Sequence, residues 1–185
     1  MEFIHFLLEL LTHTKEVLLQ LFQAHGNYIY AILFLIIFVE TGLVIMPFLP
    51  GDSLLFTAGL LCAQPSGISV FILIPLLIVA AIIGDNVNYF VGKYFSEKVL
   101  SWKIKGKPLV NPKWIEEVHH YFEKHGTKTI IIARFMPIVR TVTPFVSGVA
   151  KMNYKVFLPY DIFGGILWVT SVTLAGYFLG NIPYV

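Results

Sequence analysis

Two apolar stretches of this chain are broken by prolines, and each carries two charged side chains. The first runs from Glu40 through TGLVIMPFLPG to Asp52, and the second runs from Arg134 through FMPIV to Arg140 and on through TVTPFVSG. An interior proline costs a helix about 3 kcal/mol or more, and a charge at the centre of a membrane helix costs roughly 2.5–3.5 kcal/mol on insertion scales. Interrupted, charged backbone at membrane depth is tolerated where it lines a cavity. The pattern therefore predicts a transport site and not a simple membrane anchor.

The composition places these stretches in a membrane protein. Of 185 residues, 57% are hydrophobic and 13% are charged, whereas a soluble domain has about 25% charged residues. A net charge of +2 is too small to indicate a nucleic-acid partner. The N-terminus carries acidic residues where a signal peptide would have basic ones, so no signal peptide is predicted. The chain has a single cysteine, Cys62, which excludes an internal disulfide. We expect an all-α, multi-pass protein of the bacterial inner membrane with one domain, 1–185.

The apolar segments divide this domain into six parts. The sequence predicts an N-terminal helix at 1–24, a first re-entrant hairpin at 27–63, a spanning helix at 68–92, a basic cytoplasmic loop at 93–128, a second re-entrant hairpin at 129–150 and a spanning helix at 154–181. The arms of both hairpins are shorter than the ~20 apolar residues that a spanning helix needs. The N-terminal helix either lies on the membrane surface, which we favour, or begins a spanning helix.

The loop at 93–128 is the hydrophilic part of the chain. It holds eight lysines against four glutamates, which predicts a cytoplasmic location. The lysines either set topology alone or form a surface for anionic headgroups. Apolar residues recur there at helical spacing and predict a surface helix that rests on the headgroups: Trp114, Ile115, Val118, Tyr121 and Phe122. Three histidines are expected to be solvated, with no metal bound: His119, His120 and His125.

The two broken stretches resemble each other in layout. Each has an apolar lead, a charge, a proline, a second charge and a glycine-containing exit. Pro47 precedes Gly59 by twelve residues, and Pro137 precedes Gly148 by eleven. Interrupted helices at matching positions of two halves are the best sequence indication of a transporter site at the membrane midplane. We therefore expect an inverted repeat of two oppositely oriented hairpins. The supporting breaker residues are Pro47, Pro50, Gly51, Pro137 and Pro144.

Broken helices would let Glu40, Asp52, Arg134 and Arg140 meet at one point. On a continuous helix, Arg134 and Arg140 would lie about 120° apart around the axis. The planar guanidinium binds phosphate oxygens bidentately, so Arg134 and Arg140 are predicted to bind a phosphate. A carboxyl group in apolar surroundings close to an arginine can exchange protons. Glu40 and Asp52 are therefore predicted to carry protons.

A purely structural alternative is that buried acids and arginines pair only to neutralise each other. This alternative is stronger for Asp85 and Asp161, because each lies near an expected helix end, and we treat both as supporting residues. An enzyme is not predicted: the chain has no G-x-S-x-G or H-E-x-x-H motif, and Ser147 has no adjacent histidine. Gly164 and Gly165, and the segment Gly176–Gly180, offer close-packing faces for helix contacts within a chain or between chains of a homo-oligomer.

Three stretches carry a resemblance to a known family: FVETGLVIMPFLPGDSLLFTAG, GDNVNYFVGKYF and FEKHGTKTIIIARFMPIVRTVTPFVSGVAKMNY. They resemble the DedA family, the bacterial branch of the SNARE-associated or VTT-domain proteins, over nearly the whole chain. The resemblance implies six helical parts, two facing re-entrant hairpins and lipid translocation, with undecaprenyl phosphate or phosphatidylethanolamine as the lipid in bacterial members. It implies functional roles for Glu40, Asp52, Arg134 and Arg140. Relatives usually continue into a further spanning helix beyond the region of Ile182, where this chain stops.

These observations together predict a proton-coupled flippase for a phospholipid or a polyprenyl phosphate. The expected partners are that lipid and protons, and no cofactor is expected. Two alternatives from other classes remain: a proton or cation antiporter that affects lipids indirectly, and a non-transporting scaffold for the assembly of membrane complexes.

Overall fold

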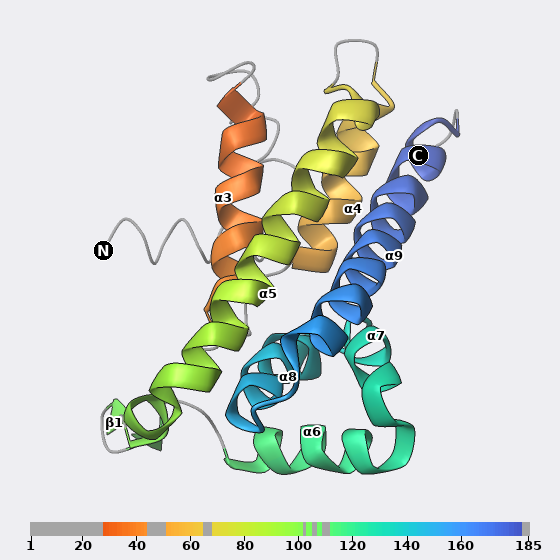
Figure 1. Cartoon of the computed structure of the whole chain (residues 1–185). Coiled ribbons are helices and arrows are strands. Elements are labelled where there is room, and N and C mark those ends of the chain that lie inside the picture. The colour runs from red at the N-terminus through yellow and green to blue at the C-terminus, as the bar shows by residue number, and fades with distance from the viewer. Residues whose placement is uncertain are drawn as a thin grey trace. The chain divides into compact units, whose positions relative to one another are not determined.

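The computed structural model of the chain describes residues 28–43, 51–64, 68–101, 103–104, 107–108 and 112–182, and these residues are predominantly helical (Figure 1). The all-α prediction is confirmed for them, apart from one two-residue antiparallel ladder. The predicted helix at 1–24, Pro47 and Pro50 lie outside the described residues. The re-entrant and inverted arrangement of the hairpins stays a prediction.

The helices and strands have the following bounds. The first broken stretch contains α3 (Ile29–Gly42) and α4 (Gly51–Cys62), and the second contains α7 (Thr129–Ala133) and α8 (Pro137–Val149). The remaining elements are α5 (Val70–Ser101), β1 (Lys103–Ile104), β2 (Lys107–Pro108), α6 (Pro112–His125), the 3₁₀ helix η2 (Gly126–Lys128) and α9 (Tyr154–Gly180).

Within the described part of the chain, two helices are long and apolar enough to cross a membrane. They are Val70–Ser96 within α5 and Tyr154–Gly180, which is α9, and each has 27 residues. Large apolar side chains along them are exposed, including Phe71, Ile72, Phe163 and Phe178. Water-soluble monomers rarely expose apolar surface on this scale. The surface of both helices therefore suits contact with lipid tails.

Helix α5 is longer than the sequence predicts. The basic loop was expected to begin at residue 93, but the helix continues to Ser101. Lysine is a good helix former, and its ammonium group can lie over a neighbouring aromatic ring on the same helix. Lys93 Nζ lies 5.5 Å from the centre of the Tyr94 ring, and Lys98 Nζ lies 6.0 Å from that of Phe95. Lys93 and Lys98 therefore belong to the helix, although the sequence analysis placed them in a loop because of their charge.

The chain forms two compact units. Unit 1 comprises the described residues of Met1–Ile37, Leu49–Val79 and Leu167–Val185, and unit 2 comprises those of Phe38–Phe48 and Ala80–Ile166. The N-terminal parts of α3 and α5 and the C-terminal part of α9 belong to unit 1. The remaining parts of these helices belong to unit 2, together with α6, α7 and α8.

In unit 1, α4 and α9 approach each other at glycines. A Cβ atom on Gly59 would lie 2.1 Å from Thr173 O, and one on Gly176 would lie 2.0 Å from Phe56 O. Both distances are far below van der Waals contact, so only glycine lets the two backbones come this close. The close-packing role predicted for Gly176 is thus confirmed for a contact within the chain.

In unit 2, α6 packs against α8, and α7 packs against both helices (Figure 1). Val118 of α6 is fully buried with Val142, Phe145 and Val146 of α8. The apolar face of α6 was expected to rest on lipid headgroups. It lies against protein instead, because α8 presents an apolar face of its own that α6 covers.

Candidate functional site

The interruption between α7 and α8 sets the positions of the two arginines. Proline disfavours helical geometry in the residue before it, and Met136, which precedes Pro137, is extended with φ −117° and ψ 108°. Pro137 then opens α8, where its missing N–H group is no loss. Arg134 therefore caps the end of α7, whereas Arg140 lies in the first turns of α8.

Arg140 forms a buried ion pair with Glu40 of α3. Its Nη2 group donates to Glu40 Oε1, and the two residues are 100 positions apart in the sequence. Arg140 is 5% exposed and Glu40 is 1% exposed. An ion pair buried in this way excludes water from both charges, so losing either partner leaves the other in a poor environment.

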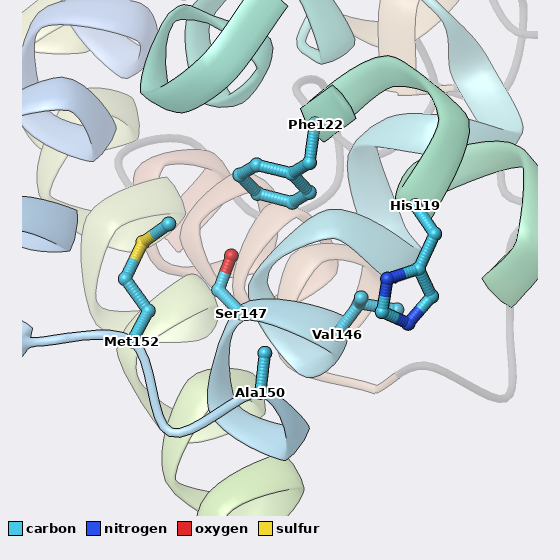
Figure 2. Close-up of a pocket in the computed structure, with 6 residues that line it drawn as sticks. All are labelled: His119, Phe122, Val146, Ser147, Ala150 and Met152. Carbon is cyan, nitrogen blue, oxygen red and sulfur yellow. The ribbon is translucent and has the colours of Figure 1, made fainter. Parts of the chain in front are cut away.

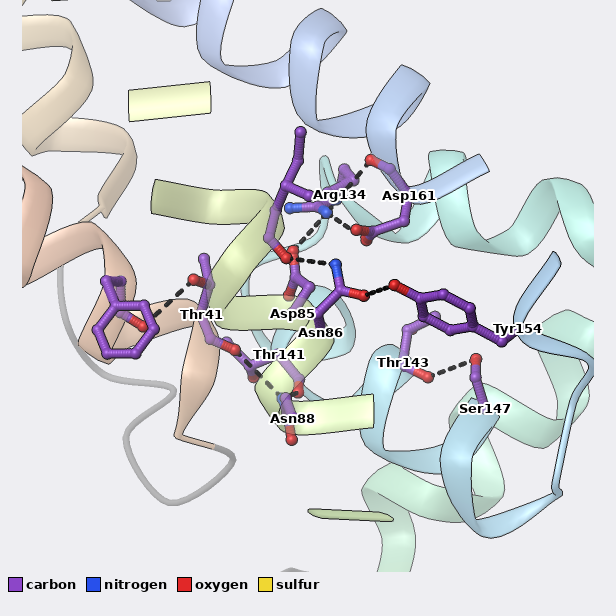
Figure 3. A network of polar contacts seen from close by, with 12 residues as sticks. Thr41, Asp85, Asn86, Asn88, Arg134, Thr141, Thr143, Ser147, Tyr154 and Asp161 are labelled. Atoms are coloured by element: carbon purple, nitrogen blue, oxygen red, sulfur yellow. Dashed lines mark hydrogen bonds and ion pairs between the residues drawn. The ribbon is translucent and has the colours of Figure 1, made fainter. Parts of the chain in front are cut away.

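Arg134 lies between two aspartates from different helices (Figure 3). Its Nη2 atom forms ion pairs with an oxygen of Asp85 on α5 and, at 2.5 Å, with Oδ1 of Asp161 on α9. All three residues are at most 3% exposed. Gly164 provides room for the arginine stem, because a Cβ atom there would lie 3.1 Å from Arg134 Cγ. One guanidinium group thus connects α5, α9 and the end of α7.

Neither aspartate lies at a helix end, which corrects the sequence interpretation of both residues. Helix α5 continues for sixteen residues beyond Asp85, and Asp161 is the eighth residue of α9. Both side chains are buried in unit 2 and both contact Arg134. They are therefore integral members of the buried ionic cluster, whereas the sequence analysis treated them as supporting residues.

Asn88 is a buried residue that the sequence analysis missed. Its side-chain amide donates to the carbonyl oxygens of Thr41, at 3.2 Å, and Thr141, at 2.7 Å (Figure 3). These two residues directly follow Glu40 and Arg140 in the chain. Asn88 lies three residues after Asp85, a spacing that shares one helix face, and this was the available signal. The Asn88 amide thus links the backbone next to Glu40 with the backbone next to Arg140.

Replacing Asn88 with alanine is expected to lower the free energy of unfolding by roughly 1–3 kcal/mol, the sum of two buried hydrogen bonds. The measurement is the thermal unfolding midpoint of the purified protein in detergent. Asn181→Ala is the matched control, because that exposed amide donates to the Tyr177 carbonyl of the helix that it directly follows, and its loss should cost less than about 0.5 kcal/mol. Equal midpoints for the two variants would contradict the role given to Asn88.

Asp52 belongs to unit 1. It lies in the first turn of α4, next to Gly51, and its Oδ1 accepts a hydrogen bond from Trp168 Nε1 at 2.7 Å. Acidic side chains are favoured at this end of a helix, where backbone N–H groups point outward. Of the four charges that the sequence expected to meet, the structure brings Glu40 and Arg140 into contact and joins Arg134 to Asp85 and Asp161.

A cavity of about 210 Å³ lies between α6 and α8 (Figure 2). His119 and Phe122 of α6 line it together with Ser147 of α8. Sequence reasoning found no histidine near Ser147, and this cavity supplies one. The Ser147 hydroxyl, however, donates its hydrogen to Thr143 O at 2.8 Å within the same helix. Its proton is thus directed to the backbone, which is not the arrangement of an activated nucleophile.

The fold and the buried cluster define a class: a helical membrane protein with a network of ion pairs buried between its helices. Comparison with known proteins agrees. The VTT domain matches residues 49–178. The chain is 47% identical to Protein DedA of Escherichia coli K12, over all of this chain and 84% of that protein. It is 37% identical to the inner membrane protein YqjA of the same strain, over 95% of this chain and 81% of that protein.

A third relative is an uncharacterised membrane protein of Mycobacterium tuberculosis H37Rv, 45% identical over 82% of this chain and 66% of that protein. No solved structure is significantly similar to the chain. The chain belongs to the DedA family of VTT-domain membrane proteins. The names of these relatives, together with the two long apolar helices, support a membrane location.

Proposed function

We propose that this chain transports a phosphate-bearing lipid across the bacterial inner membrane, with transport coupled to protons. The lipid is undecaprenyl phosphate or a phospholipid. The supporting observation is the buried ion pair of Arg140 with Glu40. A guanidinium group that pairs with a carboxylate inside a membrane protein is a site that an anionic headgroup can bind when the carboxylate releases it.

Competition between two anions supplies the coupling. Phosphate and the Glu40 carboxylate both bind the guanidinium group of Arg140, so binding of one disfavours binding of the other. A proton on Glu40 removes its negative charge and frees Arg140 for phosphate. When the phosphate leaves, Glu40 gives up its proton and the ion pair forms again. Arg134 is the second phosphate-binding group in this proposal, and Asp52 is the second proton carrier.

The membrane supplies both the path and the driving force. The lipid tails stay in the bilayer while the headgroup moves past the two interrupted stretches, which are predicted to be re-entrant from opposite sides. Each elementary charge that crosses the membrane contributes about 2.3 kcal/mol per 100 mV. Proton uptake on one side and release on the other can therefore drive the headgroup in one direction.

The test is transport by the purified chain in liposomes. Labelled undecaprenyl phosphate and labelled phosphatidylethanolamine are compared, each with and without an imposed proton gradient. The wild type should move one of the two lipids, and faster with the gradient. Arg140→Ala should reduce the rate at least about tenfold, because a charge-assisted hydrogen bond contributes about 1.5–3 kcal/mol.

Two variants make this result interpretable. Arg140→Lys keeps the charge but not the planar fork, so its transport rate should fall between those of the wild type and Arg140→Ala. Lys128→Ala removes an exposed positive charge and should leave transport unchanged. Undiminished lipid transport by a folded Arg140→Ala protein would refute the assignment of the phosphate site.

A second candidate, a proton or cation antiporter, is favoured by one observation. The buried cluster contains three carboxylates, those of Glu40, Asp85 and Asp161, against two arginines. An antiporter predicts proton flux driven by a cation gradient in liposomes, with no movement of either labelled lipid. The lipid transporter predicts that proton flux requires the transported lipid.

A further inference from the structure

The buried charges of the described chain do not balance. All five buried charged residues lie in unit 2. They are Glu40, Asp85, Asp161, Arg134 and Arg140. When all are ionised, three carboxylates face two guanidinium groups, which leaves one negative charge in excess. A buried charge without compensation is strongly unfavourable, so the cluster requires one further positive charge.

The excess charge is located at Arg134. Arg140 has Glu40 as its ion-pair partner. Arg134, by contrast, serves two carboxylates through a single atom, Nη2, which contacts an oxygen of Asp85 and Oδ1 of Asp161. Two carboxylates that share one cationic atom lie close together, and two such groups do not both ionise readily. The Asp85–Asp161 pair is therefore where the compensating charge belongs.

One of the buried polar atoms that lack a hydrogen bond among the described residues lies at this pair. Oδ2 of Asp161 is buried and has no hydrogen-bond partner within the described part of the chain. The second oxygen of a buried carboxylate normally accepts a hydrogen bond. A hydrogen on this oxygen would remove the negative charge of the Asp161 carboxylate. Asp161 Oδ1 would remain the acceptor for Arg134 Nη2.

The groups that face the pair come from every neighbouring element of unit 2. Arg134 ends α7, and Arg140 of α8 attracts Asp85 electrostatically. Glu40 of α3 is the partner of Arg140. Tyr89, another buried titratable residue, directs its hydroxyl to Met152 O at 2.5 Å. Among the described residues, the charges that act on the pair are Arg134 and Arg140 together with the two carboxylates themselves.

We propose that Asp85 and Asp161 share one bound proton when no lipid occupies the site, and that they form a proton-binding site distinct from Glu40 and Asp52. A metal cation is less suitable, because cations such as Ca²⁺ need six or more oxygen ligands and Arg134 already fills the space between the carboxylates. This inference rests on the proposed function only for its biological meaning. The site itself follows from the charge count and the geometry.

Infrared difference spectroscopy tests the site directly. The purified full chain in detergent, with no lipid substrate, is titrated with acid and base, and the carbonyl band of a protonated carboxylic acid is recorded. One such band is expected, and it should disappear on titration to high pH. Asp161→Asn and Asp85→Asn should each remove the band, because the remaining aspartate then pairs with Arg134 alone. Glu116→Gln, at an exposed position of α6, should leave it intact.

Isotope labelling gives an answer that does not depend on the folding of a variant. The chain contains three aspartates, Asp52, Asp85 and Asp161. Protein labelled with ¹³C at the side-chain carboxyl of aspartate should show the band at lower frequency, and Asp52→Asn should leave it in place. A band that does not shift, or that survives in folded Asp85→Asn and Asp161→Asn variants, would overturn the proposal. The absence of any protonated carboxylic acid band would also overturn the proposal. This includes the case in which no band is seen and added Na⁺ or K⁺ stabilises the protein.

The readout also separates this inference from the proposed function. A protein that moves neither labelled lipid but shows the aspartate band would refute lipid transport and leave the proton site standing. A protein that transports lipid without the band would refute only the proton site.

Discussion

Replacing Arg134 with glutamine is expected to lower the free energy of unfolding by about 3–5 kcal/mol, the range seen when one partner of a buried ion pair is removed. Arg134 is 3% exposed and is the cation that Asp85 and Asp161 share. Its loss leaves two buried carboxylates next to each other without a cation between them. The measurement is the unfolding midpoint in detergent, followed by tryptophan fluorescence.

Two controls separate this effect from a general loss of positive charge. Lys128→Gln makes the same charge change six residues earlier, at an exposed position, and should cost less than about 0.5 kcal/mol. Arg134→Lys restores a cation without the planar fork and should recover part of the stability. If Arg134→Gln unfolds no earlier than Lys128→Gln, the ionic contacts of Arg134 do not stabilise the fold.

The second large effect is a separation of stability from transport at the pair of Glu40 and Arg140. Glu40→Gln and Arg140→Gln are each expected to destabilise the protein, because each leaves one buried charge without its ion-pair partner. The double variant Glu40→Gln/Arg140→Gln should recover about 1–3 kcal/mol relative to the sum of the single variants, the usual coupling of residues in contact. Its lipid transport should nevertheless stay abolished.

The transport rate of this double variant decides between the function classes. If the two charges only neutralise each other, as in a scaffold, the neutral pair keeps whatever function the wild type has. If Arg140 binds phosphate and Glu40 carries a proton, the stable neutral pair can do neither. A double variant with both wild-type stability and wild-type lipid transport would remove the pair from the mechanism.

Sequence reasoning located the charged residues but not all of their partners. Arg134, Arg140 and Glu40 stand out because an ionic side chain among apolar residues beside a proline is costly and rare. The break before Pro137 likewise follows from local sterics, and it appears between α7 and α8. Such features depend on a few neighbouring residues, so the sequence alone can indicate them.

The contacts of Arg134 depend instead on three-dimensional packing. Asp85 and Asp161 lie 49 and 27 residues from Arg134, and no local rule says which acid an arginine will reach. The error about the position of Asp85 came from the charge of the residues that follow it. Lys93 and Lys98 look like the start of a loop, yet α5 includes both. Asn88 escaped notice because an asparagine near a polar segment resembles a helix end, whereas here it is buried and bonds two distant carbonyls.

The surface of α9 that Arg134 contacts has a consequence for the interpretation of other membrane helices. Asp161 is followed at three and four residues by Gly164 and Gly165, so the acid and both glycines share one helix face. Asp161 supplies the negative charge. Because the glycines have no side chains, the methylene groups of Arg134 can lie close to the backbone of α9. An acidic residue with two glycines one turn later in an apolar helix is thus a searchable mark of a receptor for a buried arginine, even where the donor segment is unknown.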